Sequence, residues 1–213
     1  MHRILSIALL SVLVLFPSAA ALAEDPGECL SDAETELLNL INQYRADNIL
    51  PPVSWSKSLT EVAQWHVWDL VTNHPDDGFN CNPHSWSDQG VWSPVCYTPD
   101  HANAAGMWNK PREITAGVYW ANGYEIAVEG SVSPAVALAL WQGSAPHNDV
   151  LLNQGIFASS VWRAIGAGIL DPFIVVWFGE LADPNGSLVA CSQWVFHDGF
   201  ESGGTLSWST TVP

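Results

Sequence analysis

Basic residues are scarce in this chain, which has six Lys and Arg against 22 Asp and Glu among its 213 residues. Arg3 lies in an N-terminal segment that we expect to be removed, and without it five basic residues face 22 acidic ones, a net charge of −17 with His neutral. Such an acidic surface repels phosphate groups. We therefore expect no nucleic-acid partner and no anionic membrane partner.

Long apolar runs are missing after the N-terminal segment, so the sequence predicts no transmembrane segment there. The first 23 residues combine Arg3, an apolar run from Ile4 to Phe16 and a small-residue site at Ala21-Leu22-Ala23. This pattern predicts a signal peptide over 1–23 and a secreted protein. The remainder suits one domain over 24–191 with a short C-terminal tail over 192–213, and we expect a monomer.

Closely spaced cysteine pairs are also absent, which disfavours a structural zinc site. The four cysteines are an even number in an exported chain, where disulfides are the usual state. Three pairings are open. We favour Cys81 with Cys96, which bracket one irregular segment, and Cys29 with Cys191, which flank the expected core.

Helical signals dominate the first half of the chain. A capping box at Ser31 to Glu34 and apolar residues at helical spacing predict a helix over 32–47, which Pro51-Pro52 would end. A second box at Ser58 to Glu61 predicts a helix over about 58–72. Ser133-Pro134 opens a third, over 135–141, with His147 just after it.

Strand signals follow later, at 124–128, 161–170 and 173–180, and the last two form a predicted hairpin. Between the second helix and these strands, residues 76–115 show no periodicity and read as a long loop held by a disulfide and buried tryptophans. The order of helices and strands indicates an α+β fold with an antiparallel sheet.

Six short motifs follow one another between residues 31 and 180. They are Glu36-Leu37-Leu38-Asn39, Trp55-x3-Leu59-x3-Ala63-Gln64, His84-Ser85, Gly123-Tyr124-Glu125-Ile126-Ala127, Trp141-x2-Ser144-x2-His147, and Ile165-Gly166-x-Gly168. The series resembles the CAP superfamily of cysteine-rich secretory, antigen 5 and pathogenesis-related-1 (SCP) domains, in a bacterial-type secreted member. The resemblance implies an α-β-α sandwich around a central antiparallel sheet.

The resemblance also implies a cleft lined by two histidines and two acidic residues, with a divalent metal such as zinc on the histidines in some members. Here the histidines match His84 and His147. The first acidic position falls on Tyr124, with a carboxylate one residue later at Glu125, so either Glu125 enters through a local bulge or Tyr124 supplies a hydroxyl. The second acidic position falls on Ser144, so that carboxylate is missing.

Other polar residues are weaker candidates. His66 lies on the apolar face of the second helix, as a buried, hydrogen-bonded residue would, whereas His101 remains an alternative ligand near the cysteine-bracketed loop. Ser85 beside His84 lacks the Gly-x-Ser-x-Gly elbow of a serine nucleophile.

Tryptophan is abundant, with 12 in the chain and four, Trp86, Trp92, Trp108 and Trp120, between the second helix and the Glu125 segment. Buried, they would anchor the long loop; exposed, they would offer platforms for sugars. We interpret the chain as a binding protein whose ligand is a small apolar molecule, a glycan or a protein. The alternatives are a metal-dependent hydrolase or protease that uses the histidine pair with Glu125, and a Trp-rich carbohydrate-binding module.

Overall fold

The centre of the protein is a three-stranded antiparallel sheet, seen in a computed structural model that describes residues 26–194. The expected signal peptide and all but the first three residues of the tail lie outside the described residues. The strands are β1 (Gly123–Glu129), β2 (Ala164–Leu170) and β3 (Phe173–Gly179), in the order β1-β3-β2. The pairing of β1 with β3 runs without interruption from Gly123 opposite Gly179 to Glu129 opposite Phe173, so β1 contains no bulge.

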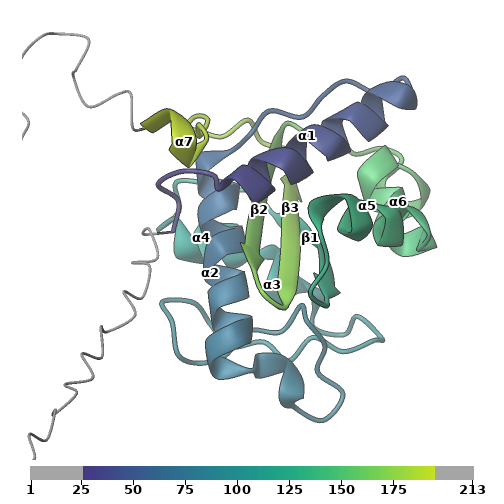
Figure 1. Cartoon of the computed structure of the whole chain (residues 1–213). Coiled ribbons are helices and arrows are strands. Elements are labelled where there is room, and N and C mark those ends of the chain that lie inside the picture. The colour runs from purple at the N-terminus through teal and green to yellow at the C-terminus, as the bar shows by residue number, and fades with distance from the viewer. Residues whose placement is uncertain (1–25, 195–213) are drawn as a thin grey trace, which may run out of the picture.

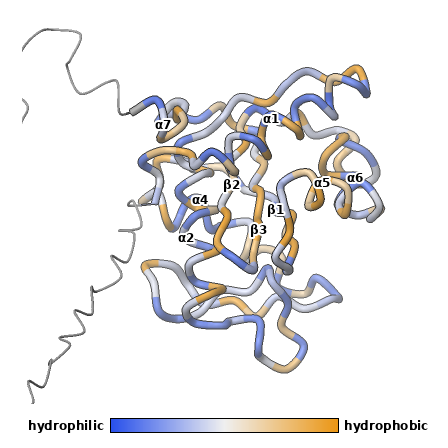
Figure 2. Tube along the Cα trace, viewed as in Figure 1, coloured by the Kyte–Doolittle hydropathy of each residue, from blue (hydrophilic) through white to orange (hydrophobic). Residues whose placement is uncertain are grey.

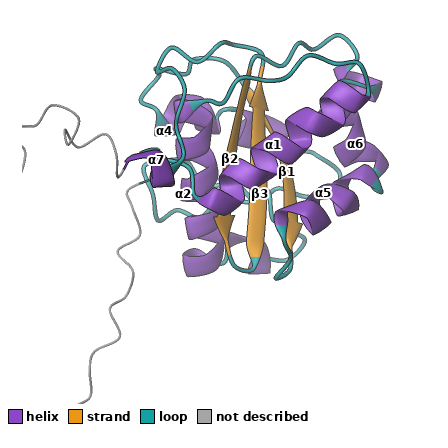
Figure 3. Cartoon of the chain, turned by 45° about the horizontal axis from the view of Figure 1, so that its top comes forward, coloured by secondary structure: helices purple, strands orange, loops and turns teal. Residues whose placement is uncertain are grey.

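Helices cover both faces of this sheet (Figures 1 and 3). Alternate side chains of β3 enter two separate cores, with Val176 and Phe178 on one face and Val175 and Trp177 on the other. The first face packs on α1, α5 and α6, and the second on α2 with α3 and α4. Their bounds are α1 (Asp32–Asp47), α2 (Lys57–Asn73), α3 (Ala104–Trp108), α4 (Lys110–Ile114), α5 (Pro134–Gln142) and α6 (Ala145–Leu152). The expected α+β class and α-β-α sandwich are confirmed.

Strand β3 is strongly hydrophobic (Figure 2), and two glycines of the neighbouring strand β2 bring α2 close to the sheet. A Cβ atom on Gly166 would lie 2.2 Å from the Thr60 amide nitrogen, and one on Gly168 would lie 2.3 Å from the Ala63 carbonyl oxygen. Only glycine permits this approach. The Gly-x-Gly motif of the sequence therefore places the α2 backbone directly against β2.

The helix starts were predicted with mixed success. The capping box of α1 is present, because Ser31 Oγ accepts the Glu34 amide and the Glu34 carboxylate accepts the Ser31 amide. The start of α2 was wrong: its N-cap is Ser56, whose hydroxyl accepts the Leu59 amide. Ser58 lies inside the helix, where its amide and hydroxyl donate hydrogen bonds to the Asp183 carboxylate.

The long loop over 76–115 contains more structure than predicted. It includes η1 (Pro75–Asp77), α3 and α4, and the described chain also has η2 (Gly155–Phe157) and α7 (Cys191–Trp194). His147 lies within α6 and not in a loop after a helix, because Ser144 caps a new helix whose first turn holds Pro146.

Both expected disulfides, Cys29–Cys191 and Cys81–Cys96, are formed. Trp86 and Trp92 are buried and anchor the loop, Trp108 is half-buried, and Trp120 is 60 % exposed. Within residues 26–194, no helix has the length and apolar character needed to cross a bilayer.

Candidate functional site

A cleft of about 600 Å³ opens between β1, α3, α6 and the loop that carries His84. Its lining combines polar and apolar side chains. Its lining residues are His84, Tyr97, His101, Ala104, Met107, Trp108, Tyr124, Glu125, Ala145, Pro146, His147, Asp149, Val150, Ile156 and Phe157. Folding therefore brings His84 and His147 to one cavity together with Glu125 and Tyr124. Ser144 is not among the lining residues.

Glu125 is a buried carboxylate held by two histidines. His84 Nδ1 lies 2.7 Å from Oε2, and His66 Nδ1 hydrogen-bonds to Oε1. Burial alone would raise the pKa of Glu125, but the charge of His66 and the hydrogen bonds from both rings outweigh it, and the net effect is a lowered pKa. Glu125 is therefore ionised at neutral pH.

His66 supplies the charge that balances this carboxylate. Its Nε2 lies 2.9 Å from the Ser85 carbonyl oxygen, which can only accept, so Nε2 carries a proton. With Glu125 ionised, Nδ1 must carry a proton as well, which makes His66 an imidazolium. The ring is fully buried and stacks on Trp86 with centroids 4.1 Å apart. The sequence prediction that His66 is buried and hydrogen-bonded is correct, but it missed that His66 belongs to the site.

The same geometry fixes the tautomer of His84. Because Nδ1 donates to Glu125, the neutral ring leaves Nε2 as an unprotonated acceptor. Glu125 reaches its position from a regular strand, on the face of β1 that also faces α2. The bulge that we considered is not needed.

His147 and Asp149 lie on α6 across the cleft. Burial lowers the pKa of His147, and a protonated His84 would lower it further, so the His147 ring is neutral at neutral pH. Neither His147 ring nitrogen nor the Asp149 carboxylate has a hydrogen-bond partner among residues 26–194. Both groups are thus available to a ligand.

Aromatic residues complete the walls. Tyr124 packs against Trp108, Phe157 and Trp162, so its ring belongs to the apolar side of the cleft. Tyr97 hydrogen-bonds through its hydroxyl to His101 Nδ1 at 2.8 Å. Burial and the negative charge of Glu125 raise the pKa of Tyr97, which keeps its hydroxyl neutral.

The donor set does not fit a resident metal ion. Protein zinc sites use three or four protein ligands, and in the part of the chain that the structure describes no group of three or more His, Cys, Asp or Glu could hold a metal. Both Glu125 oxygens are already engaged by His66 and His84. His84 and His147 would offer an ion only two imidazole nitrogens, because Ser144 stands where the family places a second carboxylate.

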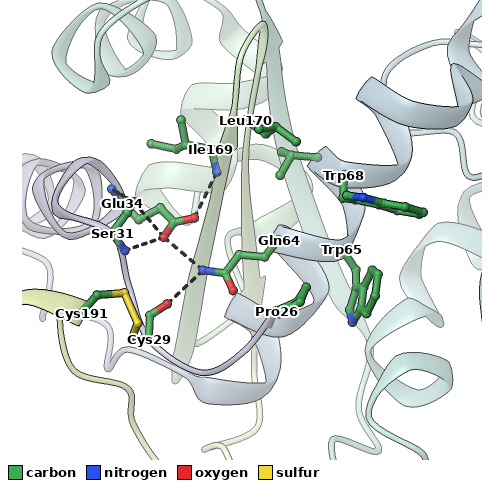
Figure 4. Close-up of a pocket in the computed structure, with 11 residues that line it drawn as sticks. Pro26, Cys29, Ser31, Glu34, Gln64, Trp65, Trp68, Ile169, Leu170 and Cys191 are labelled. Carbon is green, nitrogen blue, oxygen red and sulfur yellow. Dashed lines mark hydrogen bonds between the residues drawn. A yellow bond between two sulfur atoms is a disulfide. The ribbon is translucent and has the colours of Figure 1, made fainter. Parts of the chain in front are cut away.

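A second cavity, of about 490 Å³, lies between α1, α2 and the end of the β2–β3 hairpin (Figure 4). Glu34 at its floor accepts hydrogen bonds from the Ser31 amide and hydroxyl, the Gln64 amide group and the Ile169 amide. Burial raises the pKa of Glu34 despite these bonds. The cluster joins α1, α2 and β2, and the rest of the lining is largely apolar, including Trp65 and Trp68.

Several solved structures share features of this fold. An extracellular SCP-domain protein from Bacillus anthracis is 20% identical over 70% of this chain and 40% of its own, with a TM-score of 0.48. An outer surface protein from Borrelia burgdorferi is 17% identical over 68% of this chain and 90% of its own, with a TM-score of 0.46. A cysteine-rich secretory protein from Staphylococcus aureus is 12% identical over 70% of this chain and 39% of its own, with a TM-score of 0.46.

This chain therefore spans less than half the length of the Bacillus and Staphylococcus proteins. No curated protein sequence matches it significantly. The family model for CAP, the cysteine-rich secretory protein family, matches residues 38–161, which is more than half of the chain and includes His66, His84, Glu125 and His147. The chain belongs to the CAP family.

Proposed function

We propose that this protein is exported and binds a small amphipathic molecule in the His84–His147 cleft, without turning it over. The observation that carries the proposal is the cleft itself. Its volume of about 600 Å³ lies in the range of small-molecule sites, and its lining combines a few polar groups, including His84 and His147, with apolar side chains. Export rests on the N-terminal sequence pattern and on membership of a secretory family.

The cleft is better equipped for binding than for hydrolysis. Hydrolysis needs a nucleophile or activated water, a base and a group that stabilises an oxyanion. Ser85 is buried and its hydroxyl accepts the Tyr97 amide at 3.0 Å, so it does not face the cleft. Both Glu125 oxygens are engaged by histidines, and the described residues form no group of three or more His, Cys, Asp or Glu that could hold a metal, which disfavours the metal-dependent alternative.

Met107 offers a direct test, because it lies in the apolar wall and is the only methionine once residues 1–23 are removed. The mature chain, released from a cleavable fusion and labelled at the methionine methyl group, would be titrated with phenylbutanol. We expect the Met107 methyl resonance and the His84 and His147 ring resonances to shift together with one dissociation constant.

Two matched variants locate the site. Ala145→Trp fills the cleft from an exposed lining position, and Leu170→Trp makes a comparable change at the second cavity. We expect the first to abolish the shifts and the second to preserve them. Binding that survives Ala145→Trp but is lost in Leu170→Trp would show that the ligand binds in the second cavity instead.

A further inference from the structure

The acidic and basic side chains that line the cleft, histidines apart, are all carboxylates. Its lining contains the carboxylates of Glu125 and Asp149 and no Lys or Arg. His66 balances Glu125, so Asp149 remains as the uncompensated charge, and the mature chain as a whole is strongly acidic. An anionic group entering the cleft would therefore meet a like charge, and such a juxtaposition in a partly buried site is costly.

The hydrogen-bonding groups favour a donor. His66 and Glu125 together act as positioning residues, because they hold His84 with Nδ1 protonated and Nε2 as an acceptor. Asp149 can only accept, and the neutral His147 ring has one acceptor nitrogen. The apolar side chains of Met107 and Phe157 line the same cleft and offer a surface for a hydrocarbon body.

From this arrangement, and resting on the proposed function, we infer that the natural ligand of the cleft is an amphipathic alcohol or amine, and not a carboxylate or a phosphate. Its hydroxyl or ammonium group donates hydrogen bonds to His84 Nε2 and to the acceptors on α6. Its apolar part lies against Met107, Trp108, Ile156 and Phe157.

A series of probes with the same body and different head groups tests this assignment. Phenylbutanol, phenylbutylamine and phenylbutyrate would be titrated into the mature chain at neutral pH, with the Met107 methyl resonance as the readout. We expect the alcohol and the amine to bind at least about tenfold more tightly than the carboxylate, a difference of about 1.4 kcal/mol. A carboxylate that binds as tightly as the alcohol would overturn the inference while leaving a binding function intact. A failure of all three to bind would overturn the proposed function.

Asp149→Asn removes the unpaired charge without changing the side-chain shape. We expect it to weaken the binding of phenylbutylamine. We also expect it to reduce the difference in dissociation constant between phenylbutyrate and phenylbutanol to a few fold. Asp32→Asn makes the same charge change at an exposed position at the start of α1, outside the cleft lining. It should change neither the affinity for phenylbutylamine nor the difference in affinity between phenylbutyrate and phenylbutanol. Equal effects of the two substitutions would show that net charge, and not the cleft, sets the preference.

Discussion

Removing His66 should leave the buried Glu125 carboxylate without the positive charge that balances it. In His66→Phe the aromatic ring can still stack on Trp86, but Glu125 keeps only His84 as a partner and the Ser85 carbonyl loses its donor. Breaking a buried ion pair from one side costs about 3–5 kcal/mol, because the remaining charge stays desolvated. We expect the free energy of unfolding at neutral pH to fall by that amount in urea titrations of the disulfide-intact protein.

The cost should depend on pH. The folded-state pKa of Glu125 lies below its ordinary value of 4.5, so in the wild type the carboxylate contributes stability above that value and loses it as pH falls through the folded pKa. In His66→Phe burial is no longer offset by the His66 charge, so the pKa of Glu125 rises and its protonated form is tolerated. The difference in free energy of unfolding between the wild type and His66→Phe should therefore become smaller as the pH falls from neutral to about 5.

Glu125→Gln provides the matched control. Its amide can donate to His66 and accept from His84, so no charge is stranded and the single change should cost about 1 kcal/mol. In this background His66→Phe should cost less, which gives a coupling energy of about 2 kcal/mol in the double-mutant cycle. A coupling near zero, or a His66→Phe penalty that is constant with pH, would refute the ion-pair assignment.

Three further predictions concern other parts of the molecule. Replacing Cys81 and Cys96 together by Ser should lower the free energy of unfolding by about 3 kcal/mol, since the bridge closes a loop of 15 residues; denaturant titration measures it, and no change would show that the unfolded chain is not restricted by this bridge. Trp86→Ala should cost about 3–5 kcal/mol because the ring is buried, whereas Trp120→Ala should change stability by less than about 0.5 kcal/mol; thermal unfolding of both variants compares them, and equal losses would contradict the anchoring role. Zinc added at neutral pH should give no heat of tight binding in calorimetry, because the described residues bring no group of three or more His, Cys, Asp or Glu together to hold an ion. A strong one-to-one isotherm that is lost in His147→Ala would contradict this prediction.

Local sequence signals predicted most of the framework. The capping box at Ser31 and the apolar spacing after it located α1 at its observed bounds, because cap and periodicity act within one turn. The Gly166-x-Gly168 motif marked the strand that packs on α2. The short helices α3 and α4 escaped prediction because each is a five-residue segment without a side-chain cap. Packing under the tryptophans holds them, and that contact is not local in sequence.

The site was only partly predictable. His84 and His147 could be named from motifs, but the role of His66 depends on a contact with a residue 59 positions away. One signal was available: a histidine on the apolar face of a buried helix needs a polar partner, and a glutamate within a strand needs one as well. The sequence could not show that the two satisfy each other. The choice between Glu125 and Tyr124 likewise depended on the strand register.

The most direct test of the central claim is a long-range ¹H–¹⁵N spectrum of the histidine rings, recorded on the mature chain with and without phenylbutanol. We expect His84 to be protonated at Nδ1 and unprotonated at Nε2, and His66 to be protonated at both nitrogens. We expect the alcohol to shift the resonances of His84 Nε2 and the His147 ring together. A His84 ring protonated at Nε2, or an alcohol that moves one of these two histidines without the other, would contradict it.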